Sequence, residues 1–142
     1  MPVAKGLFTL LAGTAAVSGK LGDSTGENSL FQSAANKGAQ APYVVLHLVD
    51  VPPAAHSQDG PSGLQNGEIQ FDSYAADAPT ARALSQSVRD TLKNFSGALS
   101  EGTQIEFYEV TMDSDEGYEQ GGSGYVFKSL LRLRAFFTES GE

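Results

Sequence analysis

The fold depends most on residues 43–49, which read YVVLHLV, and on residues 68–74, which read EIQFDSY. The first segment is apolar on both alternating faces, a pattern typical of a strand that is covered on both sides or that shows one face to another subunit. The second segment alternates, with Ile69 and Phe71 on its apolar face. We predict that the two strands pair antiparallel, with a proline- and glycine-rich connection at residues 52–67 between them.

Two segments with the apolar spacing of an amphipathic helix flank these strands. Residues 3–17 repeat leucine and alanine at intervals of three and four, which predicts one buried helical face. Residues 78–95 show the same spacing, and their start carries Asp77 as a capping residue and Pro79 in the first turn. Gly97 is the expected stop signal. We therefore predict one helix before the paired strands and one after them.

A second pair of strands follows, over residues 104–112 and 125–137, joined by an acidic, glycine-rich hairpin tip at 113–124. The later strand alternates apolar residues with three cations: Lys128, Arg132 and Arg134. The predicted order of elements is α-β-β-α-β-β. We expect an α+β fold, a two-layer sandwich in which two helices lie on one face of a four-stranded, mostly antiparallel sheet.

Length and composition limit the classes of protein to which the chain can belong. Its 142 residues suit one domain, residues 1–142, with long loops at 18–42 and 52–67. The 9 basic and 17 acidic residues give a net charge of −8, which argues against DNA binding as the main function. The lack of cysteine excludes disulfides, thiolate catalysis and cysteine zinc sites. Every apolar run is shorter than the roughly 18 residues of a membrane span, so we expect no membrane partner.

No pattern of residues predicts a metal site, a cofactor site or a catalytic site. Four residues have metal-ligating side chains, but no helical or hairpin spacing brings them together: His47, Asp50, His56 and Asp59. A partly buried or interfacial His47 is the interpretation that we favour. The acidic run that begins at Asp113 fails as a calcium loop, because its fifth residue is Gly117 and its twelfth is Gly124. No serine stands in a nucleophile-elbow motif, so we do not expect an enzyme.

The distribution of charge is uneven along the chain. No lysine or arginine occurs between Asn94 and Phe127, and that stretch holds seven acidic residues: Glu101, Glu106, Glu109, Asp113, Asp115, Glu116 and Glu119. A solvated face is the simplest interpretation of such a run. A subunit with an acidic projection and a basic strand can also pack head to tail with its copies, and such contacts close into a ring when the rotation permits.

The chain resembles the tail-completion, or tail-terminator, proteins of long-tailed (siphovirus-like) bacteriophages and gene transfer agents. The resemblance is carried by AQAPYVVLHLV at residues 39–49, EIQFDSY at residues 68–74 and the helix predicted at residues 78–95, in that order. It implies a structural protein of the virion, made in the host cytoplasm, that assembles as a hexameric ring on the head-proximal end of the tail tube. The ring is expected to stop tube polymerisation and to join the tail to the head connector.

The resemblance also implies the partners: copies of the chain, the tail tube protein, the head–tail connector or adaptor protein, and DNA only as cargo that passes through the lumen. We expect the subunit interface to include six residues: Tyr43, Val45, His47, Lys128, Arg132 and Arg134. We expect the seven acidic residues between Asn94 and Phe127 to line the lumen or a contact between rings, because like charge keeps DNA from adhering.

Two alternatives stay open on the sequence. A head–tail adaptor, one ring higher in the virion, would show nearly the same sequence features. A protein of another class, a small cytoplasmic ligand-binding module or hydrolase, would use His47 and His56, and a ligand bound to its native state would raise its melting temperature.

Overall fold

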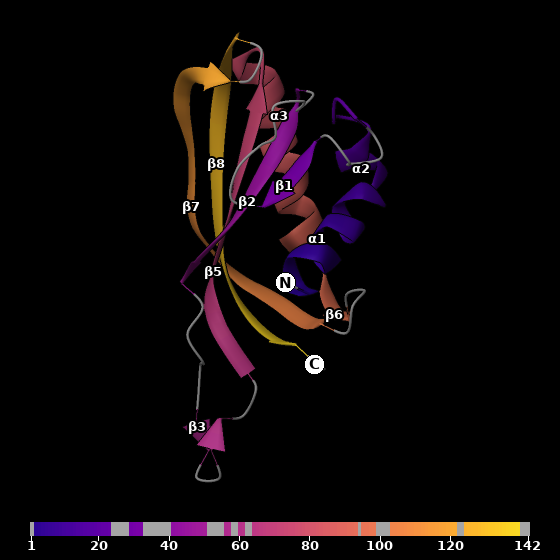
Figure 1. Cartoon of the computed structure of the whole chain (residues 1–142), viewed down its shortest axis with the longest axis vertical. Helices are drawn as coiled ribbons and strands as arrows, with labels where there is room; N and C mark the ends of the chain where they lie inside the picture. Colours follow the sequence, from indigo (N-terminus) through magenta and orange to yellow (C-terminus); the bar gives the residue numbers. More distant parts are fainter. Residues whose placement is uncertain are drawn as a thin grey trace.

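The computed structural model describes residues 2–23, 29–32, 41–50, 56–57, 60–61, 64–93, 95–98, 103–121 and 124–139. The helices are α1 (Pro2–Ala12), α2 (Ala15–Ser18) and α3 (Ala78–Lys93). The strands are β1 (Leu30–Gln32), β2 (Tyr43–Asp50), β3 (His56–Ser57), β4 (Gly60–Pro61), β5 (Leu64–Ala75), β6 (Ser96–Ala98), β7 (Thr103–Gly121) and β8 (Gly124–Glu139). Six strands form one sheet in the order β1-β2-β5-β8-β7-β6, and β3 pairs with β4 separately (Figure 1).

The main sheet is mixed and strongly curled, so the predicted four-stranded two-layer sandwich is wrong. Two strands of three residues each, β1 and β6, extend the sheet at its two edges. β1 pairs with β2 in parallel, whereas every other pair in this sheet is antiparallel. The long strands β7 and β8 bend along their length, and the sheet has the shape of a half-barrel (Figure 1). Strands as short as β1 and β6 contain too few residues for a periodic signal.

The predicted pairing of the two central strands is confirmed. β2 and β5 are antiparallel, with Tyr43 opposite Tyr74 and Leu48 opposite Ile69. β5 begins earlier than predicted, at Leu64, so the end of the expected 52–67 connection is strand. β8 pairs with the whole of β5 on the side away from β2. β5 therefore lies between β2 and β8, at the centre of the sheet.

The β7–β8 hairpin is longer than predicted, and β7 is irregular. The expected tip at residues 113–124 is strand up to Gly121 and again from Gly124. Three shifts of register interrupt the pairing with β8: Phe107/Glu109, Val110/Met112 and Asp115/Gly117. At such a bulge two residues face one on the partner strand, which changes the alternation of side chains and increases the twist.

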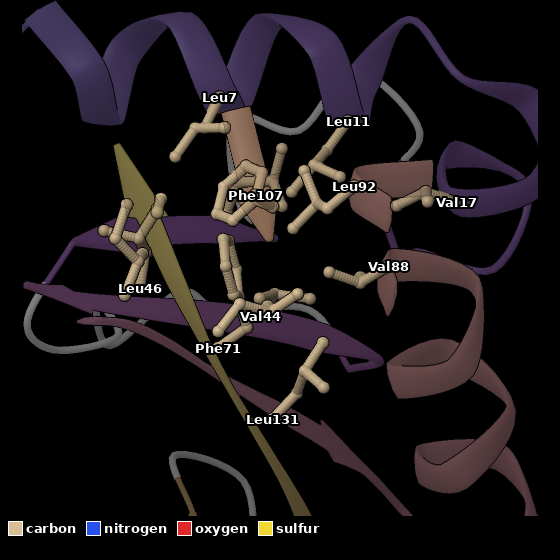
Figure 2. Close-up of a cluster of buried hydrophobic side chains, with 14 of the residues drawn as sticks. Leu7, Leu11, Val17, Val44, Leu46, Phe71, Val88, Leu92, Phe107 and Leu131 are labelled. Carbon is tan, nitrogen blue, oxygen red and sulfur yellow. The ribbon is translucent and has the colours of Figure 1, made fainter. Parts of the chain in front are cut away.

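The helices and one face of the sheet enclose the core. α3 contributes Leu84, Val88 and Leu92, and it confirms the helix predicted after the central strands. The helix predicted over residues 3–17 is instead divided into α1 and α2, since Thr14 has extended backbone angles. Figure 2 shows Leu7 and Leu11 of α1 pointing toward Phe107 of β7 and Leu92 of α3. Side chains of α1, of α3 and of the sheet therefore meet in one cluster.

Candidate functional site

The face of the sheet away from the helices, the outer face, carries all six residues predicted at a subunit interface. Val44 and Leu46 of β2, and Leu131 and Leu133 of β8, belong to the helix-covered core. Successive side chains of a strand point to opposite faces, so the residues that alternate with these lie on the outer face. These are Tyr43, Val45 and His47 of β2 and Lys128, Arg132 and Arg134 of β8.

The buried carboxylate of Asp72, on β5, contacts residues of both neighbouring strands, β2 and β8. Asp72 is 2% exposed. Its Oδ2 lies 3.1 Å from Nε2 of His47 and 3.7 Å from Nζ of Lys128. Its Oδ1 accepts a hydrogen bond of 2.8 Å from Nε2 of Gln70. Burial of a carboxylate costs free energy unless it is paired and hydrogen-bonded, and this network supplies both.

The cations farther along β8 have partners on both neighbouring strands. Arg132 donates two hydrogen bonds, of 3.2 and 2.6 Å, to Oε1 of Gln70. Arg134 lies 3.6 Å from Glu68 of β5 and 3.7 Å from Glu109 of β7. The outer face therefore carries a row of polar contacts across β5, β8 and β7.

Two of the six predicted interface residues are already buried within the chain. Tyr43 is 6% exposed and Val45 is 3% exposed, in a cluster with Phe31, Tyr74 and Val126. The ring of Tyr43 stacks on that of Tyr74 with a centroid distance of 4.9 Å. The apolar outer side of β2 is thus covered inside the subunit, whereas His47 keeps 34% of its side chain exposed.

The large apolar side chains that are exposed lie elsewhere on the outer face, and sequence reasoning missed them. Among the described residues three are exposed by more than a third: Tyr108 at 43%, Met112 at 42% and Phe136 at 38%. Tyr108 stacks on Phe136 with a centroid distance of 4.7 Å. Alternation from the core residues Ile105 and Phe107 puts Tyr108 on this face, so this signal was present in the sequence.

The seven acidic residues do not gather on one face. Asp113 and Asp115 face α3, where Arg89 Nη1 lies 2.8 Å from Asp113 and Arg82 Nη2 lies 2.6 Å from Asp115. Glu109 lies opposite Arg134 on β8. Glu106 and Glu116 are exposed on β7. Glu101 and the side chain of Glu119 lie outside the described residues.

The other sequence candidates give no site in the described part of the chain. No group of three possible metal ligands occurs among the described residues. Asp59 and the side chains of Asp50 and His56 lie outside them. No described helix is long and apolar enough to cross a membrane.

The ion pair between Arg82 and Asp115 predicts a dependence of stability on pH. The hydrogen bond from Arg82 holds the pKa of Asp115 below its ordinary value of 3.8, with a smaller contribution from Ser129. A carboxylate with a lowered pKa stabilises the fold above its ordinary pKa, and this stabilisation disappears as the pH falls through the lowered value.

We expect Asp115→Asn to lower the free energy of unfolding by about 0.5–1 kcal/mol at pH 7, since solvent screens this exposed pair. The difference from the parent chain should shrink as the pH falls below 3.8, where Asp115 of the unfolded chain takes up a proton, and it should vanish below the lowered pKa of the folded chain. Urea unfolding of both proteins at pH 7, 5 and 3 measures this difference in the free energy of unfolding. A difference that is the same at all three values would contradict the assignment.

Comparisons with known proteins agree with this architecture. The family model described as Tail completion protein gp17 matches residues 5–137. A chain of the solved structure entitled "Virion of native gene transfer agent (GTA) particle" aligns with a TM-score of 0.64 and 18% identity, over 94% of each chain. At this identity the likeness concerns the fold. No curated protein matches the chain.

Proposed function

Because the chain belongs to the tail completion protein family, and is thus a structural protein of a bacteriophage-type virion tail, we propose that it forms a ring at the head-proximal end of the tail tube. The ring is a hexamer that ends polymerisation of the tube and joins the tail to the head connector. The observation that carries the proposal is the family match over residues 5–137, a range that includes the whole of β2 and β5 and most of the β7–β8 hairpin.

The outer face is the surface by which we propose that neighbouring copies meet. It combines the exposed apolar residues Tyr108, Met112 and Phe136 with half-exposed cations such as Arg134. Contiguous exposed apolar side chains with polar neighbours are typical of protein interfaces. A closed ring needs two different surfaces in contact, and this mixed face supplies one of them.

The acidic residues that no described arginine neutralises are the ones we place at the lumen. Glu106 and Glu116 are exposed on β7, and Glu101 and Glu119 belong to the same acidic stretch of sequence. A lumen lined by like charge repels the phosphates of DNA, which lets the cargo pass without adhering. Asp113 and Asp115 contribute less to this field, because α3 supplies each with an arginine.

A structural function fits the surface better than an enzymatic one. The buried carboxylate of Asp72 is held by His47, Gln70 and Lys128, so its lone pairs serve the fold. The family is defined by tail completion, and the exposed features of the outer face suit contact between proteins.

Electron microscopy of the purified protein, alone and mixed with its tube protein, tests the proposal. We expect annular particles with six-fold symmetry, and tubes that stop growing when the ring is added. Rings that bind only the connector would instead indicate an adaptor, and a monomer that neither closes into rings nor arrests tubes would contradict the proposed function.

Charge reversal on the outer face should weaken the ring. We expect Arg132→Glu to shift the equilibrium toward monomers by at least tenfold, because it reverses the charge of a cation in the proposed contact. Lys20→Glu, an exposed lysine in the turn after α2, is the matched control and should leave the rings intact. Analytical ultracentrifugation measures the equilibrium, and equal behaviour of the two variants would exclude Arg132 from the contact.

A further inference from the structure

A cleft between α3 and β7, next to the proposed ring contact, has the features of a binding site. The cleft has a volume of about 460 Å³, and its walls are the last two turns of α3 and residues 107–113 of β7. Phe107, Val110 and Leu133 give it an apolar floor. Arg89 and Lys93, one helical turn apart, lie at its other wall.

The hydrogen-bond donors of the cleft outnumber the acceptors that contact them in the described part of the chain. Nη1 of Arg89 donates to Asp113, but Nε of Arg89 is buried and has no hydrogen-bond partner among the described residues. Lys93 is exposed at the end of α3. The two carboxylates of the cleft have cations beside them already, since Asp113 is bound by Arg89 and Glu109 lies 3.7 Å from Arg134.

The Arg89 side chain keeps 34% of its surface exposed, so a carboxylate in the cleft can approach its guanidinium group and the ammonium group of Lys93. A charged acceptor beside a guanidinium and an ammonium group makes the stronger class of hydrogen bond. The apolar floor adds a place for one aliphatic or aromatic side chain next to that carboxylate.

The edge of β7 along this cleft can also receive polypeptide backbone. β6 pairs with β7 only from Gln104 to Glu106, and no described strand pairs with β7 on that side from Phe107 onward. Figure 1 shows β7 at the outside of the sheet, with β8 as its neighbour. Extended peptides bind other domains by placing their backbone against such an edge.

We propose that the α3–β7 cleft binds an extended, acidic peptide segment of a partner protein, with an apolar side chain on the floor and its neighbouring carboxylate at Arg89 and Lys93. The bulge before Glu109 turns Val110 toward the floor, and bulges are common beside binding sites. The cleft borders the proposed ring contact, because Tyr108 and Glu109 of its lining also belong to the outer face. Arg89 and Lys93 lie on α3, which covers the other face of the sheet.

Binding of labelled, acetylated hexapeptides tests the proposal. The probes alternate glutamate with one of valine, leucine, isoleucine or phenylalanine, and matched peptides carry glutamine in place of glutamate. By fluorescence anisotropy we expect at least one acidic peptide to bind at least tenfold more tightly than its glutamine counterpart. We expect Lys93→Glu to weaken that binding at least tenfold, and Lys20→Glu, outside the cleft, to leave it unchanged.

Three results would overturn the proposal: no binding of any acidic peptide, equal binding of the glutamine peptides, or equal binding by the Lys93→Glu variant. If the peptides fail and Lys93→Glu alone changes the sedimentation of the protein, a second copy of the chain occupies the cleft, and the proposal is wrong in this form. Absence of peptide binding leaves the expected formation of six-fold particles in electron microscopy unaffected, so the two proposals fail separately.

Discussion

Phe71→Ala is expected to lower the free energy of unfolding by about 3–5 kcal/mol, the range for loss of a buried aromatic side chain. Phe71 is fully buried at the centre of β5, with β2 on one side and β8 on the other. Its ring lies in the cluster that joins the sheet to α1 and α3. Truncation leaves a cavity that these elements cannot close without moving the sheet.

Phe136→Ala is the matched control for this substitution. Phe136 is also a phenylalanine, near the C-terminal end of β8, but it points to the outer face and is 38% exposed. We expect it to cost at most about 1 kcal/mol, since it loses only part of an aromatic contact. Urea unfolding followed by circular dichroism compares the two, and equal losses would contradict the division of the sheet into a core face and an outer face.

Lys128→Met is expected to destabilise the fold by about 3 kcal/mol, because it removes the cation beside the buried carboxylate of Asp72. The value is at the low end for a buried pair, since Lys128 keeps 21% of its side chain exposed. His47 and Gln70 would still contact Asp72, but neither replaces the fixed positive charge.

The double variant Asp72→Leu with Lys128→Met separates the cost of an unpaired charge from the value of the pair. Replacement of both partners by apolar side chains of similar size is often close to neutral. We therefore expect the double variant to be at least 1–2 kcal/mol more stable than Lys128→Met alone. If Lys128→Met alone is as stable as the parent chain, the buried carboxylate of Asp72 is not stabilised by Lys128.

The sequence predicted the elements whose signals are local. α3 follows a capping aspartate and an early proline, and its apolar residues repeat over four turns. The pairing of β2 with β5 follows from one segment that is apolar on both faces and one alternating segment, which are consecutive strands of the main sheet apart from the short β3–β4 pair. The placement of the cations of β8 on the outer face also follows from alternation, which is regular in that strand.

The features that the sequence did not predict depend on distant residues. β1 pairs in parallel with a strand more than ten residues away, and three residues carry no period of their own. The bulges of β7 place Val110 in the core and Glu109 beside Arg134, which simple alternation from Ile105 would reverse. The pair between Arg82 and Asp115 joins residues 33 apart, so neither local propensity nor spacing contains it.

The same bulges affect what happens to subunits before assembly. A straight, unpaired edge as long as β7 would be a template on which copies of the chain stack into fibrils. The three irregular points interrupt the even spacing of its amide and carbonyl groups. The long strand of another copy therefore cannot pair along the whole edge, so newly made subunits do not aggregate through this strand, whereas a short peptide can still pair with the few residues between two bulges.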